Sequence, residues 1–592
     1  MRPTFPSRAL RPTLICSIVA CSGCASTSNT DPSSTDLRRS IVQSVQQETG
    51  GLTIQSNPPT PLQRTPATDL GFSPERRAEL DSIAGWSSYS SSSLPTDTDL
   101  LGQTSPTVTV SLERVIRAAV DQNLRVQSAR LDPAIRAAQV TQAEAQFDWV
   151  FFTGVDWANT DEPRVAPVIG GVPVGSRANV NQAIAYDTGV RRPLTTGGEF
   201  SVSQGLTHTE TRTPGLATLP EPANNAFIEL GLNQPLLRGF GSDATESEIR
   251  LARNAERSSI QSLKAQAMRT ALDAETAYWE LVRARRRLLI ANRLVERGVQ
   301  TRDVLKGRLE FDVRPAEYSD SVARVEGRRA DLIRAQRAVR EASDRLKAIL
   351  NDPNIPVGSE TLLIPADEPV DEPISFSLVD ALVSALENRP EIERALLSID
   401  DASIRQAFAD NARLPLLDLA VRTRFNGLDD SPGGAYDQIT DGDFVNYVAS
   451  LQFEQPIGNR AAEALSRARR LERMKSVLDY KTAAQDAALR VKSALRNVVT
   501  NYQLIEQTRV ARLAASENLR TLLVEEETLR ALTPDFLDLK LRRQESLASA
   551  ELEETAALVD YNIAVAEMFD AMGRALERNG IRFNVHDAPA TP

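Results

Sequence analysis

Histidine and cysteine carry much of the nucleophilic, acid–base and metal chemistry of proteins, and this chain holds few of either. Its two histidines are His208 and His586, and its three cysteines all lie within the first 24 of 592 residues. A Ser/His/Asp triad, a histidine metal cluster, a cysteine zinc site or a disulfide framework therefore cannot be assembled in the body of the chain. We predict that the protein is not an enzyme and binds no metal or cofactor.

The cysteines belong to a stretch with the features of an export signal. Arginines precede a short apolar run at residues 14–20, and small residues follow it, which is the pattern of a secretory leader. The residues "IVAC", which end at Cys21, resemble a bacterial lipobox, in which the cysteine is acylated and becomes the mature N-terminus. Residues 1–20 are then a lipoprotein signal peptide. Cys24 is the competing acylation site, and ordinary cleavage without lipid is a further alternative.

The composition favours long helices over a thick globular core. Apolar residues make up 41% and aromatic residues 5% of the chain, and the net charge of −11 is spread over mixed Arg/Glu surfaces without a basic block. We therefore do not expect nucleic acid as a partner. Residues 21–108 are rich in Ser, Thr, Pro and Asp and too poor in aliphatic residues to bury a core. We predict a tether there, with one short helix near Ser73 to Ala84.

Two segments of alternating polar and apolar residues each end in a Gln-Pro pair. They are "ELGLNQPLLRGFG" at residues 229–241 and "SLQFEQPIGNR" at residues 450–460, and a long run with hardly a helix breaker follows each. Period-two alternation indicates a strand, so a strand leads directly into a long helix twice. We expect Gln234 and Gln455 to satisfy backbone groups at this transition, where the proline sets the entry to the helix.

The alternation places apolar side chains on one face of the strands and polar side chains on the other. The predicted lipid-facing residues are Trp149, Phe151, Leu419, Val421 and Tyr447, and the predicted lumen-facing residues are Asp418, Arg422, Gln452 and Glu454. A two-sided sheet packed on helices in water is the alternative. The adjoining helices are too long and too rich in alanine to lie across a short sheet, which favours a transmembrane β-barrel.

Helical runs complete two internal repeats. Repeat 1 spans residues 109–350, with a β-hairpin at about 147–235, a long helix at about 242–313 and a return helix at about 316–349. Repeat 2 spans residues 376–574, with a β-hairpin at about 416–456, a long helix at about 460–532 and a return helix at about 535–572. Residues 351–375 link the repeats, and residues 575–592 form a tail. Each long helix is roughly 100 Å long at 1.5 Å per residue.

The hairpin of repeat 1 carries an insertion. Residues 183–190 and 199–210 within it alternate like strands around a turn at Gly197-Gly198, whereas residues 168–176 are predicted as loop. The alternation leaves open whether this insertion extends the sheet or projects from it.

The order helix, strand, strand, long helix, return helix, found twice, resembles the TolC family of outer-membrane efflux proteins. The lipobox-like leader, Leu414-Pro415 and the Gln-Pro junctions contribute to the resemblance, which covers about residues 108–576. It implies a fold that is mostly α with a transmembrane β-barrel portion. In that fold three protomers each give four strands to a twelve-stranded barrel, which a periplasmic α-helical barrel continues.

The resemblance also implies a function. The protein would be a lipid-anchored channel-tunnel of the outer membrane, the passive exit duct of a tripartite efflux or type I secretion system. Its partners would be a periplasmic adaptor (membrane fusion) protein and an inner-membrane transporter, and its cargo stays open. The alternative is a periplasmic coiled-coil adaptor or scaffold without a pore, which would lack the aromatic-rich strands.

Charged residues gather where each long helix turns at a proline. They are Asp312, Arg314, Glu317, Arg530, Asp535 and Asp538. The resemblance places these turns at the periplasmic end of the duct, where threefold symmetry would crowd like charges around one axis and form a gate. Alternatively, the acidic residues cap the return helices, because Asp and Glu are favoured in a first helical turn.

The lipobox-like stretch makes a testable prediction. Mass spectrometry of the mature protein should find an acylated N-terminal Cys21, or failing that Cys24. Cys21→Ser should move the acyl group to Cys24 or abolish it, whereas Cys16→Ser should change nothing because Cys16 is removed with the leader. An unmodified mature N-terminus beyond Cys24 would contradict the anchor.

Overall fold

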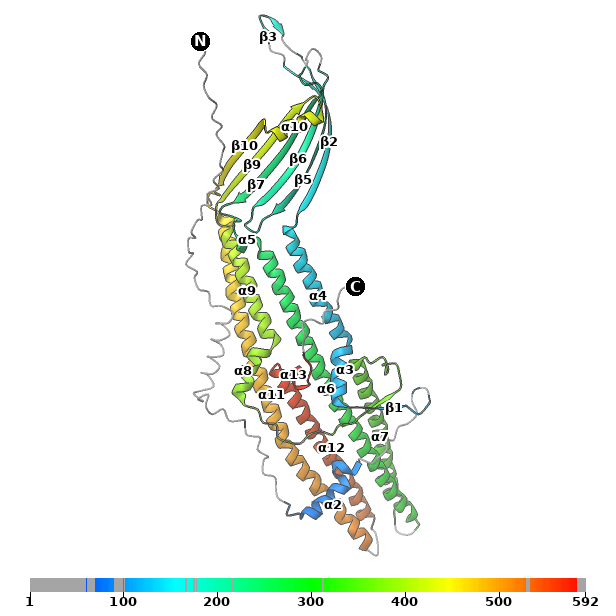
Figure 1. Ribbon diagram of the computed structural model, residues 1–592. Coiled ribbons are helices and arrows are strands. Elements are labelled where there is room, and N and C mark those ends of the chain that lie inside the picture. Colours follow the sequence, from blue (N-terminus) through cyan, green and yellow to red (C-terminus); the bar gives the residue numbers. More distant parts are fainter. Residues whose placement is uncertain are drawn as a thin grey trace.

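The computed structural model describes residues 60, 70–89, 100, 102–165, 168–173, 176, 178–213, 218–310, 313–528 and 533–582. These residues form an elongated body with a sheet at one end and long helices running away from it (Figure 1). Cys21, Cys24, Asp312 and Arg530 lie outside the described residues.

The helices of the first half lead into the sheet and away from it. They are α3 (Leu112–Gln122), α4 (Leu124–Glu144), α5 (Ser242–Thr245), α6 (Ser247–Gly307) and α7 (Pro315–Leu350). Ser111 caps α3, since its hydroxyl oxygen accepts a hydrogen bond from the N–H of Arg114 at 3.4 Å. The long helix expected at about 242–313 is divided at Glu246 and ends at Gly307, a poor helix former.

The second half has the same kinds of helix. They are α8 (Leu378–Asn388), α9 (Pro390–Asn411), α11 (Arg460–Thr528), α12 (Pro534–Ala571) and the short α13 (Ala575–Arg578), which lies within the expected tail. Pro315, Pro390 and Pro534 each occupy the first position of a helix, where a missing N–H costs no hydrogen bond. The 69 residues of α11 correspond to roughly 100 Å of helix.

Six antiparallel strands form one sheet in the order β10-β9-β7-β6-β5-β2. The strands are β2 (Val150–Pro163), β5 (Ala178–Pro193), β6 (Glu199–Thr211), β7 (Ala223–Pro235), β9 (Leu416–Asp429) and β10 (Phe444–Glu454). The resemblance implied four strands per chain for the barrel, whereas the sheet of the described residues has six. The insertion of the first half supplies β5 and β6, which lie between β2 and β7 (Figure 1).

Part of the insertion expected as loop also forms strands. Residues 168–169 (β3, Val168–Ile169) pair with residues 172–173 (β4, Val172–Pro173). The tight turn between them needs positive φ angles, which Gly170 and Gly171 supply at 62° and 85°.

The helices pack side by side below the sheet. α4 packs against α6, α6 against α9, and α9 against α11, and further from the sheet α12 contacts both α6 and α11 (Figure 1). The short helix α10 (Pro432–Asp441) joins β9 to β10 and packs on β7 and β9.

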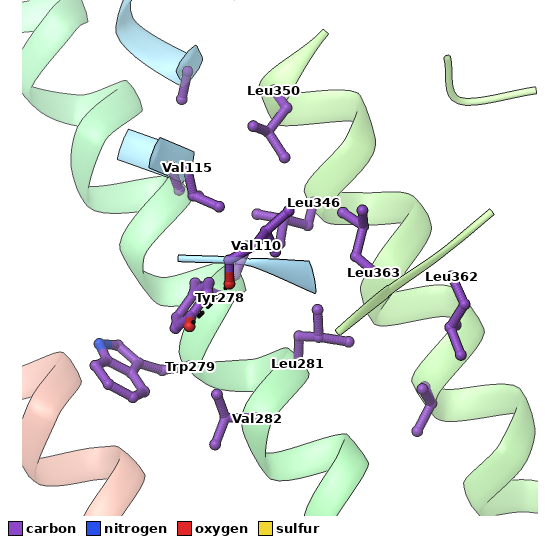
Figure 2. Packing of buried hydrophobic residues seen from close by; sticks show 14 of the residues in the cluster. Val110, Val115, Tyr278, Trp279, Leu281, Val282, Leu346, Leu350, Leu362 and Leu363 are labelled. Carbon is purple, nitrogen blue, oxygen red and sulfur yellow. Dashed lines mark hydrogen bonds between the residues drawn. The ribbon is translucent and has the colours of Figure 1, made fainter. Parts of the chain in front are cut away.

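A large apolar core of the described residues lies midway along the helices, around a small two-stranded sheet. β1 (Thr107–Val110) pairs in parallel with β8 (Leu362–Pro365), a strand from the expected linker. Val110, Val115, Leu281 and Leu346 pack around the fully buried Tyr278 (Figure 2). The Tyr278 hydroxyl donates to the Asp367 carboxylate at 2.8 Å and accepts from the Asp367 N–H at 2.9 Å. Tyr278 thus ties α6 to the chain after β8.

Tyr278 should be a major contributor to stability. Tyr278→Ala removes a buried aromatic ring and should lower the free energy of unfolding by about 3 to 5 kcal/mol. Tyr278→Phe leaves the Asp367 N–H without its partner and should cost about 1 to 3 kcal/mol. Thermal unfolding in detergent, followed by circular dichroism, measures both. Arg337→Ala, at an exposed ion pair on α7, is the control and should stay within about 0.5 kcal/mol of wild type.

Candidate functional site

The sheet has one apolar face. The strand register aligns Phe151, Val190, Val202, Leu230, Thr423 and Tyr447 in a single row across all six strands. Side chains directly opposite one another point to the same side of a sheet, so this row defines the apolar face. Phe151 is 69% exposed and Tyr447 is 78% exposed. In one copy of the chain this face therefore presents large apolar side chains to the surroundings.

The other face is polar. The adjacent row consists of Phe152, Gly189, Ser203, Glu229, Arg424 and Asn446, and it defines the polar face. Arg424 lies 3.7 Å from the Glu229 carboxylate, and its guanidinium carbon lies 3.8 Å from the ring centroid of Phe227.

The two predicted sets of strand residues lie on opposite faces. Leu419 and Val421 share the apolar face with Phe151 and Tyr447, because they alternate along β9 with Thr423. Trp149 comes just before β2, and its ring packs edge-on against Phe200 of that face at 6.4 Å between centroids. The residues predicted to face the lumen lie on the polar face: Asp418, Arg422, Gln452 and Glu454.

The first Gln-Pro junction fastens the sheet to the helices. The Gln234 side-chain amide donates to the carbonyl oxygens of Thr196 and Pro235 at 3.1 and 2.9 Å, and its oxygen accepts from the Thr196 hydroxyl at 2.8 Å. Gln234 thus satisfies backbone groups at the transition, as expected from the sequence. The Asn411 side chain also accepts from the Gly239 N–H at 2.7 Å, which joins the end of α9 to the same turn.

The far end of the helices carries the charges predicted as a gate. Glu317, Asp535 and Asp538 line a pocket of about 290 Å³ together with Asp320. Glu317 accepts a hydrogen bond from the Arg314 N–H at 3.0 Å, so it caps α7, as the alternative interpretation expected. Asp538 pairs with Arg324 at 3.0 Å and with Arg542 at 2.5 Å.

Two arginines of α7 that sequence reasoning missed connect this helix to α12. Arg324 bridges Asp320 and Asp538, and Arg328 binds the Glu545 carboxylate and the Leu541 carbonyl oxygen, each at 3.0 Å. A Cβ on Gly298 of α6 would lie 2.6 Å from the Arg328 guanidinium, so glycine makes room for this buried cation. A glycine within a long helical run was the available signal.

A segment of the expected tether docks across the helices. It comprises Ser73–Tyr89, with α2 (Pro74–Ala84) and the 3₁₀ turn η1 (Trp86–Tyr89), and we call it the N-terminal strap. Its own side chains Leu80 and Ala84 are fully buried. The sequence predicted the helix at this position, but its partners could not be read from a segment so poor in apolar residues.

Ion pairs and arginine stacking hold the N-terminal strap on both halves of the chain. Arg76 and Asp81 pair with Glu517 and Arg512 of α11, each at 2.7 Å. On α6, Arg286 donates to the Gly85 carbonyl oxygen at 2.8 Å and lies over the Tyr89 ring. The strap thereby connects the long helices α6 and α11.

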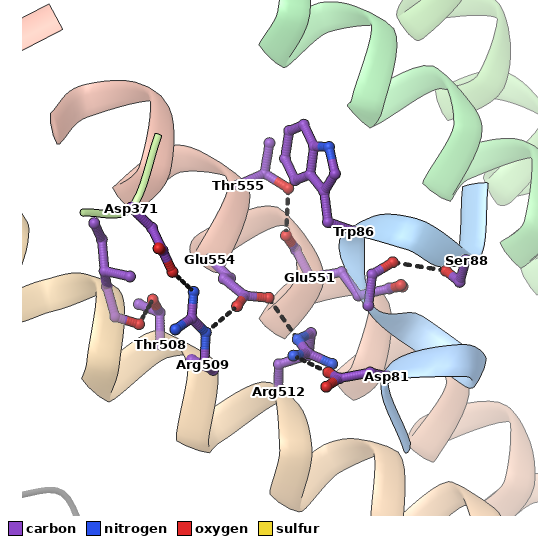
Figure 3. A network of polar contacts seen from close by, with 12 residues as sticks. Asp81, Trp86, Ser88, Asp371, Thr508, Arg509, Arg512, Glu551, Glu554 and Thr555 are labelled. Carbon is purple, nitrogen blue, oxygen red and sulfur yellow. Dashed lines mark hydrogen bonds and ion pairs between the residues drawn. The ribbon is translucent and has the colours of Figure 1, made fainter. Parts of the chain in front are cut away.

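The buried Arg512 is the centre of a wider polar network (Figure 3). It binds Asp81 of the strap and, at 2.5 Å, Glu554 of α12. Arg509 shares Glu554 at 3.2 Å and pairs with Asp371 of the segment that links the two halves. The N-terminal strap, the linker, α11 and α12 thus meet at Arg509 and Arg512.

Glu551 of α12 is a buried carboxyl beneath the strap. Its Oε1 accepts a hydrogen bond from the Tyr89 hydroxyl at 2.9 Å. Burial raises the pKa of Glu551 to about 7, although the Tyr89 hydroxyl and the cations of Arg286, Arg293 and Arg297 act in the opposite direction.

The described residues contain no group of three or more His, Cys, Asp or Glu side chains arranged to hold a metal ion. His208 lies at the far end of β6, where its Nδ1 is 2.9 Å from the side-chain oxygen of Asn224. Within the same part of the chain, no helix is both long and apolar enough to cross a membrane.

Comparison with known proteins identifies the fold. No family model and no curated protein sequence matches the chain. The open-state outer-membrane channel MtrE of Neisseria gonorrhoeae is 17% identical, with a TM-score of 0.56 over 82% of this chain and 95% of that one. The CmeC outer-membrane channel of Campylobacter jejuni is 14% identical, with a TM-score of 0.55 over 78% and 86% of the two chains. The outer-membrane protein VceC of Vibrio cholerae is 13% identical, with a TM-score of 0.53 over 78% and 96%.

All three are outer-membrane proteins with the fold of the TolC family. The chain shares this fold, as the sequence resemblance implied, and at these identities the comparison speaks to the fold alone.

Glu551 should make the docking of the N-terminal strap depend on pH. Its folded pKa of about 7 lies above the ordinary value of 4.5, so the docked state retains a proton that the released state loses. The contribution of Glu551 to docking is therefore complete below about pH 4.5 and is lost as the pH rises through about 7. The melting temperature should fall between pH 5 and pH 8, and Glu551→Gln should reduce this fall. Glu553→Gln, on the exposed side of the same helix, should keep the wild-type difference, and an unchanged slope in Glu551→Gln would count against this role.

Proposed function

We propose that the chain is the outer-membrane exit channel of a tripartite export system. Three copies close a transmembrane β-barrel from their sheets and a tube across the periplasm from their helices. Cargo passes passively through the bore, so the protein is not an enzyme. A periplasmic adaptor protein and an inner-membrane transporter are the expected partners, and lipid on Cys21 or Cys24 anchors the protein in the outer membrane.

The exposed apolar face of the sheet carries this proposal. Contiguous exposed apolar surface on a folded protein marks contact with another apolar phase. Phe151, Tyr447 and their neighbours in the row lie on the side opposite to Glu229 and Arg424, which is the arrangement of a barrel wall between lipid and a water-filled lumen. A periplasmic scaffold without a pore has no need of such a face.

The two edges of the sheet support closure between copies. β2 and β10 lie at the ends of the strand order. β2 leads from the helices into the sheet and β10 leads back to them, so β10 of one copy and β2 of the next run antiparallel. Pairing them continues the alternation around the wall and leaves no open edge, which lipid would not tolerate.

The arginine links at the far end of the helices suggest a closed state. Arg324 and Arg328 hold α7 against α12 through Asp538 and Glu545. If these links keep the tips together, Arg324→Gln with Arg328→Gln should raise single-channel conductance in planar bilayers several-fold. Arg334→Gln, which removes an exposed pair within α7, is the matched control and should conduct like wild type.

The same preparation tests the channel itself. The purified protein should require detergent and migrate as a heat-sensitive trimer. A water-soluble protein without conductance would refute the channel and favour the scaffold. Conductance with no difference between the double variant and wild type would leave the channel in place and move the gate elsewhere.

A further inference from the structure

We infer that the β5–β6 hairpin is an integral part of the membrane wall, so that three copies close an eighteen-stranded barrel as wide as the helical tube below it. This inference rests on the proposed function. It identifies the far ends of the helices, instead of the barrel, as the part of the duct that limits cargo size.

Backbone pairing places the hairpin inside the sheet. β5 pairs with β2 from Arg191 opposite Val150 to Ala178 opposite Pro163. On its other side, β6 pairs with β7 from Glu199 opposite Asn233 to Thr209 opposite Ala223. Removing the hairpin from the wall would break both sets of backbone hydrogen bonds, and β2 and β7 would then have to pair with each other.

The side chains of the hairpin continue both faces. Ile184, Val190, Phe200 and Val202 lie on the apolar face. Val190 lies opposite Phe151, and Val202 lies opposite Leu230 of the flanking strands. Asp187, Ser201 and Ser203 lie on the polar face. A hairpin projecting into water would gain nothing from an apolar face in register with its neighbours, whereas a lipid-facing wall requires one.

Paired glycines and phenylalanines allow the inserted strands to bend. Phe152 lies opposite Gly189, and Phe227 lies opposite Gly205, all on the polar face. A Cβ on Gly189 or Gly205 would come within 2.7 or 2.5 Å of the facing ring. The ring therefore occupies the space of the missing side chain, and glycine positions of this kind are where barrel strands curve.

The circumference of an eighteen-stranded wall is close to that of the helical tube. Four helices, α4, α6, α9 and α11, adjoin the strands of each chain, so a trimer has twelve. At about 8 to 10 Å between helix axes, the helical tube measures about 95 to 120 Å around. Strands about 4.8 Å apart and tilted by about 35 to 45° give about 105 to 120 Å for eighteen strands.

The physical consequence concerns cargo. A wall of eighteen strands is in the range that leaves a wide aqueous channel. The barrel then imposes no narrower limit than the tube, and the α7 and α12 ends with their arginine links are the constriction.

Cysteine pairs introduced into the full-length chain distinguish a wall that includes the β5–β6 hairpin from a wall in which β2 pairs with β7. Phe151, Val202 and Leu230 lie in one row on β2, β6 and β7. A disulfide needs Cα atoms within about 7 Å, which adjacent strands provide, whereas β2 and β7 are three strand spacings apart, about 14 Å. Val202→Cys with Leu230→Cys should therefore crosslink in isolated outer membranes, and Phe151→Cys with Leu230→Cys should not.

Two controls complete the experiment. Phe151→Cys with Val190→Cys joins neighbouring strands and should crosslink, and the parent chain, whose cysteines all lie within the first 24 residues, is the blank. The reverse pattern, with Phe151 and Leu230 crosslinked and Val202 and Leu230 not, would overturn the inference.

Electron cryo-microscopy of the assembly in lipid nanodiscs counts the strands directly. Eighteen strands are expected. A conducting trimer with twelve strands would refute this inference and leave the proposed function standing. A protein that neither trimerises nor conducts would refute both.

Discussion

The register of the six-stranded sheet is the constraint on which the rest of the structure depends. A slip of one residue on any strand would turn its apolar side chains to the polar face. The row from Phe151 to Tyr447 is unbroken over all six strands, including the two from the insertion. Four strands are joined to helices at the same end of the strands. The register of the strands therefore also determines where each helix begins along the long axis of the molecule and which helices lie side by side.

The helices depend on connections of a different kind. Buried arginines bind polar groups between the helices: Arg286 under the N-terminal strap, Arg328 between α6, α7 and α12, and Arg512 between α11 and α12. Burial lowers the pKa of Arg286 and Arg328, yet each keeps carbonyl oxygens or carboxylates as partners. Buried cations are costly to leave without a partner, so these contacts specify one arrangement of the long helices. A conformational change in the helical tube would have to break these arginine contacts and form others.

The strap and the linker bring together parts of the chain that are far apart in sequence. Asp81 precedes the first half of the chain, and Asp371 lies between the two halves. Both pair with arginines of α11. The short parallel pair of β1 and β8 joins the same two regions through backbone hydrogen bonds and the core around Tyr278. These contacts lie between the sheet and the charged ends of the helices (Figure 1).

The sequence by itself determined whatever has a local period or a local cap. Alternation of period two assigned Leu419 and Asp418 to opposite faces, proline marked the starts of α7 and α12, and the Gln-Pro pair marked the change from strand to helix. Only the tertiary structure decided the number of strands in the sheet, the partners of Asp538 and the docking of the strap. The physical reason is that a period specifies which way a side chain points along one element but carries no information about which element lies beside it. Whether β5 pairs with β2 or projects into water, and whether Arg314 or Arg324 reaches a carboxylate of α12, depends on contacts between residues far apart in the chain.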